Sequence, residues 1–342
     1  MQPRIPEKNK KPGVCYAVTD DGLELPVIDV TNPAFAVQLS EQELDALLQK
    51  HIKEVKSRER VPGFIMRLML RLMQRNSILM RGIAATAGTY MTGMNTYILK
   101  LGPENLNEDY ASNLDRKVAT SVPVLSARLR LQDIAHLLAD RLILVLSSDE
   151  KSPIHLINIG GGPGVDSFNV LILLQKDHPV LLAGRRIFIH ILDLDEIGPN
   201  FGARTLKSLM ADNGPLHGLD IRFDHIKYDW SDPTVMRELV KSFDGKKVIV
   251  AASSEGALFE YGSDSEIIAN LRTLHEVTSS SAVAVGTVTR ADDTGRLMNS
   301  ASQAALKLRS LEAFTALGQH AGWKITKSID RPMSHDILME KT

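Results

Sequence analysis

A short apolar run that ends in closely spaced glycines constrains this chain more than any other feature. The run covers 155–159, reads His-Leu-Ile-Asn-Ile, and is followed by glycines at 160, 162 and 164. Glycine lets the backbone turn tightly and approach a ligand closely. The next segment, Val165 to Gln175, has the length and apolar content of a helix. A strand, a glycine loop and a helix in this order predict a nucleotide-type site at the carboxyl end of a parallel strand.

The second half of the chain repeats this alternation of strands and helices. We expect strands at 155–159, 187–193, 221–228, 247–253, 281–288, 323–329 and 335–340, most of them separated by helical stretches. Such alternation predicts an α/β fold with a mostly parallel, seven-stranded sheet covered by helices on both faces. The last two strands are joined by residues 330–334 only, which is too short for a crossover helix. We therefore expect the last strand to be antiparallel.

The first half of the chain has a different character. Residues 1–22 are expected to form an irregular arm, and 23–30 a short strand. Ser40-Glu41-Gln42-Glu43 has the capping-box pattern, which predicts a helix from there to about Val55. Further helices are expected at 62–81 and 124–146. We therefore divide the chain into a helical N-terminal cap, 1–124, that supplies the substrate pocket, and a sheet domain, 125–342.

Three arginines give the expected 62–81 helix a cationic stripe. Arg67, Arg71 and Arg75 follow one another at four-residue spacing, so they share one face of the helix. We interpret this as a core helix with a solvated cationic side. A face for a membrane surface or an acidic partner is the alternative.

Composition excludes several classes of function. The net charge of −1 gives no support for nucleic-acid binding. A single cysteine, Cys15, rules out an internal disulfide framework and a cysteine zinc site, and we expect no bound metal. No apolar stretch is long enough to cross a membrane, and no secretory signal pattern is evident, so we expect a cytoplasmic protein without a membrane partner.

Acidic and aromatic residues follow several of the predicted strands. The second strand ends at Asp193-Leu194-Asp195, and an acid there can accept both ribose hydroxyls. Asp193 lies 29 residues beyond Gly164, longer than the usual spacing of about 20. The third strand ends at Asp229-Trp230, which can hold an adenine amino group and ring face. The fourth ends at Ser253-Ser254-Glu255-Gly256. These groups should meet at one edge of the sheet, because parallel strands end there together.

This arrangement resembles the class I S-adenosylmethionine (SAM)-dependent methyltransferases over about residues 125–342. The glycine motif of that family is acid-x-Gly-x-Gly-x-Gly, and residues 158–164 match it except that Asn158 replaces the acid. The resemblance implies a Rossmann-like sheet and SAM as the cofactor. It also implies that SAM is held by residues of the loop and of the strand ends, namely Asn158, Gly160, Gly161, Gly162, Gly164, Asp166, Asp193, Leu194, Asp229, Trp230, Ser253 and Ser254.

A finer likeness is to methyltransferases of the leucine carboxyl type. In that group an arginine five residues before an aspartate holds the carboxylate of SAM, and Arg128 and Asp133 have this spacing. Residues 162–166 look like the group's Gly-x-Gly-x-Asp. Residues 255–261 look like its Glu-Gly-x-x-x-Tyr, with Tyr261 one residue late. The likeness implies that Arg128 is part of the cofactor site.

The resemblance implies methyl transfer to a small-molecule acceptor. A hydroxyl or amine acceptor would need a base, for which Glu255 or a tyrosine (Tyr261, Tyr90 or Tyr97) is available. Two alternatives stay open. One is a SAM-consuming cyclase of the azetidine-2-carboxylate synthase type, which releases methylthioadenosine. The other is a regulatory protein that binds SAM without turnover. The Met-rich region 64–94 would be the face of a homodimer.

Several of these candidate residues also have a purely structural interpretation. Arg128 would then be a surface residue on its helix, and Asp229 a helix cap. Glu255 would pair with a structural cation. Tyr90 and Tyr97 would be core aromatics.

Overall fold

The sheet of the second half is the central layer of the molecule. In the computed structural model, which describes residues 4–58, 62–108, 110–243, 247–299 and 304–342, seven strands run in the order β5-β4-β3-β6-β7-β9-β8. The strands are β3 (Ile154–Ile159), β4 (Arg186–Asp193), β5 (Asp220–Lys227), β6 (Ile249–Ser254), β7 (Val283–Thr289), β8 (Trp323–Asp330) and β9 (Ser334–Lys341). The neighbouring strands β5, β4, β3, β6 and β7 pair in parallel. β9 lies antiparallel between β7 and β8, which confirms the predicted antiparallel last strand.

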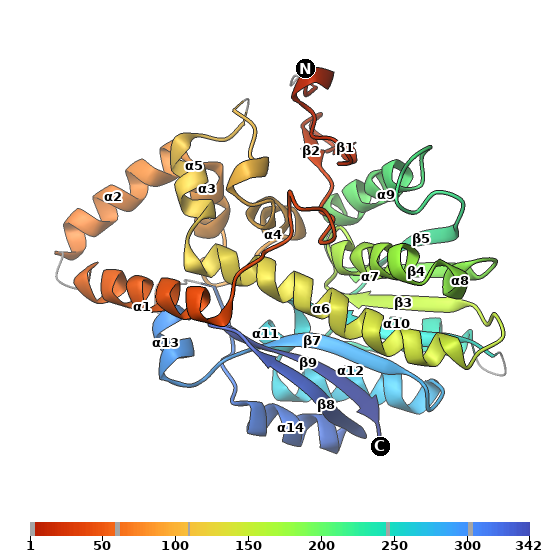
Figure 1. The fold of residues 1–342 in the computed structure, drawn as a ribbon. Helices are drawn as coiled ribbons and strands as arrows, with labels where there is room; N and C mark the ends of the chain where they lie inside the picture. Colours follow the sequence, from red (N-terminus) through yellow and green to blue (C-terminus); the bar gives the residue numbers. More distant parts are fainter. Residues whose placement is uncertain (1–3, 59–61, 109, 244–246, 300–303) are drawn as a thin grey trace.

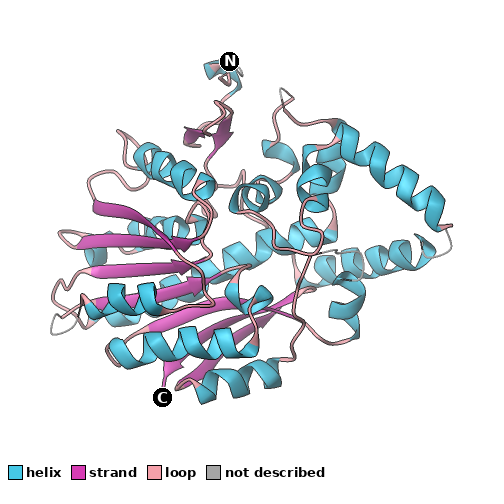
Figure 2. Cartoon of the chain, turned by 180° about the vertical axis from the view of Figure 1, so that it is seen from behind, coloured by secondary structure: helices cyan, strands magenta, loops and turns pink. Residues whose placement is uncertain are grey.

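Helices cover both faces of this sheet, as Figures 1 and 2 show. One face packs against α6 (Val122–Ser147), α7 (Val165–Asp177) and α9 (Ile197–Leu209), with the short α8 (Pro179–Leu182) beside them. The other face packs against α10 (Thr234–Lys241), α11 (Leu258–Tyr261), α12 (Asp264–Val277) and α14 (Leu311–His320). Every residue of β3, β6 and β7 is buried, as expected for strands covered on both faces.

The N-terminal region forms a second group of elements. They are the 3₁₀ turn η1 (Glu7–Asn9), the strands β1 (Tyr16–Val18) and β2 (Glu24–Pro26), the helices α1 (Glu41–Arg58), α2 (Gly63–Asn76), α3 (Ile78–Ala84) and α4 (Gly93–Lys100), the turn η2 (Pro103–Asn105) and α5 (Asn113–Ala119); α13 (Asp293–Asn299) lies near the other end of the chain. The arm at 1–22 is therefore less irregular than predicted, because β1 pairs with β2.

The predicted single helix at 62–81 is two helices. Ser77 has an extended backbone (φ −142°), and its hydroxyl accepts a hydrogen bond from Met80 N at 3.0 Å, which caps α3. Asp115 of α5 accepts further hydrogen bonds from the Ser77 hydroxyl and from Leu79 N, at 2.5 and 2.9 Å. The helix is interrupted here because the Asp115 carboxylate accepts the hydrogen bonds of donors at the start of α3.

The interpretation of this region as a core helix is wrong for α2. No residue of α2 is buried, and the Phe64 and Leu68 side chains are 67% and 60% exposed. Sequence periodicity alone does not show whether an apolar face finds a partner.

The cap and the sheet domain share one hydrophobic core. Leu25, Leu79 and Leu101 of the N-terminal region belong to the same cluster as Leu138 of α6 and Ile189 of β4. The expected division at 124/125 falls within α6, which begins at Val122 and packs on the sheet. That boundary stays a prediction. No helix within the described part of the chain is long and apolar enough to cross a membrane.

Candidate functional site

One cavity lies at the carboxyl ends of β3, β4, β5 and β6. It encloses about 850 Å³ of space, with the open solvent at its mouth included. Its floor is the glycine loop after β3, and α4 of the N-terminal region lies over it. The lining residues are Tyr90, Met91, Thr92, Gly93, Thr96, Tyr97, Lys100, Asn158, Gly160, Gly161, Gly162, Pro163, Val165, Asp166, Leu192, Asp193, Leu194, Asp195, Tyr228, Trp230, Glu255, Gly256, Ala257 and Tyr261.

The glycine loop has the conformation that its sequence requires. Gly160 and Gly162 have φ values of +66° and +49°, in the left-handed region that favours glycine. Gly162 also lies directly beneath α4, because a Cβ at Gly93 would stand 2.6 Å from the Gly162 Cα. At Gly161 a Cβ would come within 2.3 Å of the Asn158 side chain. The loop therefore leaves its backbone open to the cavity while the cap rests on it.

Asp193 lies at the end of β4, where its carboxylate meets the glycine loop. Its Oδ2 accepts a hydrogen bond from Gly162 N at 2.8 Å, and its Oδ1 accepts one from Asp195 N at 2.9 Å. Burial raises the pKa of this carboxyl above its ordinary value. Each oxygen keeps a lone pair for a ligand, since a carboxylate oxygen accepts two bonds.

Asn158 and Asp166 form a buried polar pair beneath the loop. The Asn158 amide Nδ2 donates to Asp166 Oδ1, and Ser167 N donates to the same oxygen at 2.9 Å. Asn158 Oδ1 is buried and has no hydrogen-bond partner among the described residues. The Ser253 side chain lies close enough to the Asp166 carboxyl to stabilise its charged form by a hydrogen bond. Burial raises the pKa of Asp166. Asp166 thus brings a carboxyl to the place where the methyltransferase motif has its first acid and this chain has Asn158.

Glu255, at the end of β6, is the centre of a buried ion network. Its carboxylate is bonded by the Lys100 ammonium from α4 and by Arg130 Nε of α6, the latter at 2.5 Å. Arg130 also donates to Glu260 at 3.1 and 3.2 Å. Burial raises the pKa of Glu255, but the two cations outweigh it, and the pKa is below its ordinary value. Glu255 is therefore a weak base, and its observed surroundings match the structural alternative.

The three candidate tyrosines differ in what their hydroxyls do. The Tyr97 hydroxyl is turned away into the cap, where it donates to Pro26 O at 2.6 Å. Tyr90 is 41% exposed and meets Trp230 and Tyr261 edge-on, with ring centres 6.3 and 6.4 Å apart. Burial raises the pKa of Tyr261 to about 12. The rings of Tyr90, Trp230 and Tyr261 form an aromatic wall of the cavity.

Arg128 lies apart from this cavity. Its Nη2 donates to Phe35 O at 3.0 Å, and its guanidinium packs against Gly102. Asp133 instead binds Arg331, at 2.5 and 2.8 Å. Arg128 and Asp133 lie five residues apart on α6, as the sequence indicates, but each binds a residue outside the cavity. These contacts therefore do not show the likeness to leucine carboxyl methyltransferases.

Four further candidates stand just outside the cavity lining. Gly164 (φ +75°) is the residue before α7 and packs against Ile191. Asp229 is exposed and accepts from Ser231 N at 2.9 Å in a local turn, whereas Asp232 and not Asp229 accepts from Thr234, the first residue of α10. Ser253 and Ser254 are buried in β6.

The residues that the sequence did not single out come chiefly from α4 and the segment before it. Thr92, Gly93, Thr96 and Lys100 line the cavity. Their segment is rich in small residues, a sign of close packing, but only the fold shows that it packs on the glycine loop.

Comparison with known proteins gives likeness in structure only. No protein-family model matches the chain, and no curated protein is similar to it in sequence. A structure of a possible exported protein from Bordetella parapertussis aligns over 89% of this chain and 97% of its own, with a TM-score of 0.57 at 14% identity. At this identity the likeness shows the fold alone.

Two more distant structures contain bound SAH, the demethylated form of SAM. LepI in complex with SAH and a substrate analogue aligns over 89% of this chain and 95% of its own, with a TM-score of 0.44 at 12% identity. Magnesium protoporphyrin IX methyltransferase from Synechocystis, with bound SAH, aligns over 65% and 89%, with a TM-score of 0.43 at 12% identity. By its own strand order and antiparallel β9, the chain has a Rossmann-like α/β fold.

Proposed function

We propose that this protein binds SAM in the cavity and is a SAM-dependent transferase acting on a small molecule. The observation that carries the proposal is the convergence of the glycine loop, Asp193, Trp230 and the Asn158–Asp166 pair on one covered cavity at the strand ends. Ligands of open α/β sheets bind at this edge. Bound SAM would supply a methyl group activated by its sulfonium.

The residues present fit the groups of SAM. Asp193 has lone pairs free for the two ribose hydroxyls, and Leu194 and Trp230 offer apolar contact for adenine. The buried Asn158 Oδ1, which has no partner among the described residues, and the Asp166 carboxyl are acceptors for an ammonium group.

The chain's own contribution to transfer would be positioning and exclusion of water. The N-terminal end of α4 and the aromatic wall enclose the cavity, so that an acceptor is held in line in a dry site. No histidine is present among the described lining residues, and Glu255 is held by two cations. The site therefore favours an acceptor that is already ionised, such as a carboxylate, because such an acceptor needs no base.

One observation favours a second candidate, the SAM-consuming cyclase. Asp166 is buried, and burial raises its pKa although the Ser253 side chain opposes the shift. A carboxylate of raised pKa beside an ammonium is suited to take its proton. The freed amine would then form a bond to the γ-carbon as the carbon–sulfur bond breaks, with methylthioadenosine as the leaving group.

Incubation of the protein with SAM alone, with products read by mass spectrometry, separates these functions. Intact SAM with saturable binding supports transfer to an acceptor, and a panel of small carboxylates is the next screen. Methylthioadenosine and a four-carbon amino acid, formed in proportion to protein, would establish the cyclase. Saturable binding without any turnover across the panel would leave the regulatory alternative. Absence of SAM and SAH binding by calorimetry would overturn the proposal.

A further inference from the structure

The helix α2 carries a row of large apolar side chains on its exposed surface. Phe64, Leu68 and Leu72 follow one another at four-residue spacing, so they lie along one side of the helix. Leu72 is 50% exposed, and the neighbouring Met69 is exposed to the same extent. We call Phe64, Leu68 and Leu72 the apolar row. Contiguous apolar side chains in the open mark an interaction surface, because soluble proteins seldom gather them there.

The apolar row faces away from the rest of the molecule. The partly buried residues of α2 are on the other side of the helix, at Met66, Leu70 and Met73. α2 is in contact chiefly with α3, the helix that follows it. In Figure 1, α2 lies at the outer end of the cap, away from the sheet. A partner that covers the apolar row would therefore approach from outside.

A row of arginines borders the apolar row. Arg67, Arg71 and Arg75 are exposed, and each lies three or four residues from a member of the apolar row, which makes them neighbours on the helix surface. We call these three residues the arginine row. α2 contains no acidic residue. The outer face of α2 is thus both apolar and positively charged.

The positive charge continues into the end of α1. Residues 50–76 contain eight lysines and arginines but two glutamates, although the whole chain has a net charge of −1. No aspartate or glutamate occurs between 60 and 103. Figure 1 shows that the last turns of α1 and the start of α2 lie at the same outer end of the cap. The chain therefore concentrates its positive charge at the end where its apolar row is exposed.

These charges decide which partner fits. Two copies of α2 packed face to face would bring their arginine rows together with no carboxylate on either helix, which disfavours a homodimer through this face. An anionic lipid surface offers acyl chains to the apolar row and phosphates to the arginine row. The long arginine stems let the charged ends reach the headgroups while their methylenes stay in apolar contact. Apolar and basic rows on one short helix are typical of helices that lie in a membrane interface.

We infer that α2 is an interfacial membrane helix that binds an anionic lipid surface, with the apolar row at the acyl boundary and the arginine row at the phosphates. With 14 residues it is too short to cross a bilayer, so it would lie flat on one. The inference does not depend on the proposed function. It places the cap, which supplies α4 above the cavity, at the lipid surface.

Flotation of the full chain with lipid vesicles tests this inference. The wild type should float with vesicles of phosphatidylglycerol and phosphatidylcholine but not with phosphatidylcholine alone, and binding should weaken as salt is raised. The triple variant Arg67→Gln, Arg71→Gln, Arg75→Gln should lose at least about tenfold in vesicle affinity, since each basic residue near an anionic surface contributes to binding. The double variant Phe64→Ser, Leu68→Ser should lose about as much, because less apolar area enters the interface.

Matched changes elsewhere on the surface are the controls. Val180→Ser removes an apolar side chain of α8 that is 77% exposed. The triple variant Lys207→Gln, Lys241→Gln, Lys324→Gln removes three exposed cations far from α2 in sequence. Both controls should bind vesicles like the wild type. The thermal unfolding midpoint of every variant should stay near that of the wild type, because all the changed side chains are exposed.

Several results would overturn the inference. A wild type that does not float with anionic vesicles would do so, as would binding that both α2 variants retain. A concentration-dependent dimer in analytical ultracentrifugation that Phe64→Ser, Leu68→Ser dissociates would show that a second copy covers the apolar row. Tighter binding to soluble poly-glutamate than to the vesicles would assign this face to an acidic polypeptide.

Discussion

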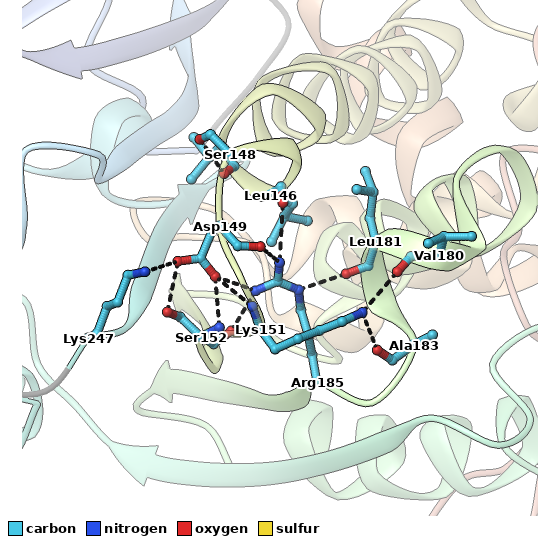
Figure 3. Close-up of polar contacts among 11 residues, drawn as sticks. Leu146, Ser148, Asp149, Lys151, Ser152, Val180, Leu181, Ala183, Arg185 and Lys247 are labelled. Atoms are coloured by element: carbon cyan, nitrogen blue, oxygen red, sulfur yellow. Dashed lines mark hydrogen bonds and ion pairs between the residues drawn. The ribbon is translucent and has the colours of Figure 1, made fainter.

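The two ends of the sheet each hold a buried ion network, and the two networks differ in completeness. At the end opposite the cavity, Arg185 binds Asp149 and four backbone carbonyls, as Figure 3 shows. Its Nη1 donates to Asp149 Oδ1 at 2.7 Å and to Ser152 O at 2.9 Å, and its Nε donates to Leu181 O at 2.7 Å. The five donors of a guanidinium are all used there.

The network at the cavity is unfinished by comparison. Among the described residues, Lys100 has one hydrogen-bond acceptor, and the buried Asn158 Oδ1 has no donor. The Arg185 network, in which every guanidinium donor is hydrogen-bonded, holds the connection between α6 and β3 in place. A network that leaves donors and acceptors unmet at a cavity wall is suited to a ligand. Both networks are buried, so burial does not distinguish a structural ion pair from one that is available to a ligand. The fraction of its donors and acceptors that are hydrogen-bonded does distinguish them.

The largest expected effect is the loss of stability when the Arg185 network is disrupted. Arg185→Met should lower the free energy of unfolding by about 3–5 kcal/mol, because it leaves Asp149 and several buried carbonyls without their donor. The midpoint of urea unfolding measures this, and SAM affinity well below the transition should be unaffected. A loss as small as that of an exposed ion pair would show that the two networks do not differ in this way.

The stability contributed by the Arg185–Asp149 network should depend on pH. Burial raises the pKa of Asp149, but hydrogen bonds from Arg185 and Ser152 outweigh it and hold the pKa well below its ordinary value. A carboxyl of depressed pKa contributes stability above its unfolded pKa of about 4, and that contribution is lost as pH falls further. The stability difference between the wild type and Arg185→Met should therefore shrink from pH 7 to pH 3. A difference that stays constant in urea unfolding would contradict this linkage.

At the cavity, Asp193→Ala should weaken binding of SAM and SAH by about 1.5–3 kcal/mol, since it removes an acceptor of charge-assisted bonds. The free energy of unfolding should also fall, by about 1–3 kcal/mol, because the buried Gly162 N loses its acceptor. Calorimetric titration measures the affinity. An unchanged Kd would remove Asp193 from the ribose site.

Glu255→Gln should destabilise the fold by about 1–3 kcal/mol, because Lys100 and Arg130 lose their shared charge partner. The effect is expected to be smaller than that of Arg185→Met, since the amide oxygen still accepts a hydrogen bond. Thermal unfolding with and without SAH is the measurement. If Glu255 were a general base, turnover would fall by orders of magnitude at unchanged stability.

The smallest effect belongs to Tyr97. Tyr97→Phe removes the hydroxyl that donates to Pro26 O, and about 0.5–1.5 kcal/mol of stability should be lost with it. Ligand affinity should not change, because that hydroxyl faces the cap. Tyr261→Phe is the matched change on the aromatic wall. A loss of SAM affinity in Tyr97→Phe would restore this residue as a functional candidate.

Much of the sheet could be predicted from the sequence because strand patterns are local. Each of the seven predicted strands is present with ends shifted by few residues, and the short connection at 330–334 correctly indicated the antiparallel pairing. The glycine loop has the predicted backbone, since a positive φ at Gly160 and Gly162 is a property of glycine itself.

Predictions that depended on a partner far along the chain succeeded less often. The helix break at Ser77 depends on hydrogen bonds to the distant Asp115. The helix α2 is exposed because no described element covers its apolar residues. Arg128 has the right spacing to Asp133, yet both side chains bind residues elsewhere. Glu255 stays a predicted candidate base, and only the structure shows the two cations that bind it.

The sequence by itself determined the α/β fold, the glycine loop and the row of polar groups at the strand ends, because strand periodicity and glycine conformation act over a few residues. Only the tertiary structure decided which of those groups are satisfied and which are left open. Lys100 and Asn158 are 58 residues apart in sequence, and nothing local to either indicates that they share a cavity. Burial and hydrogen-bond satisfaction are properties of the packed chain, and they distinguish the structural residues from those available to a ligand.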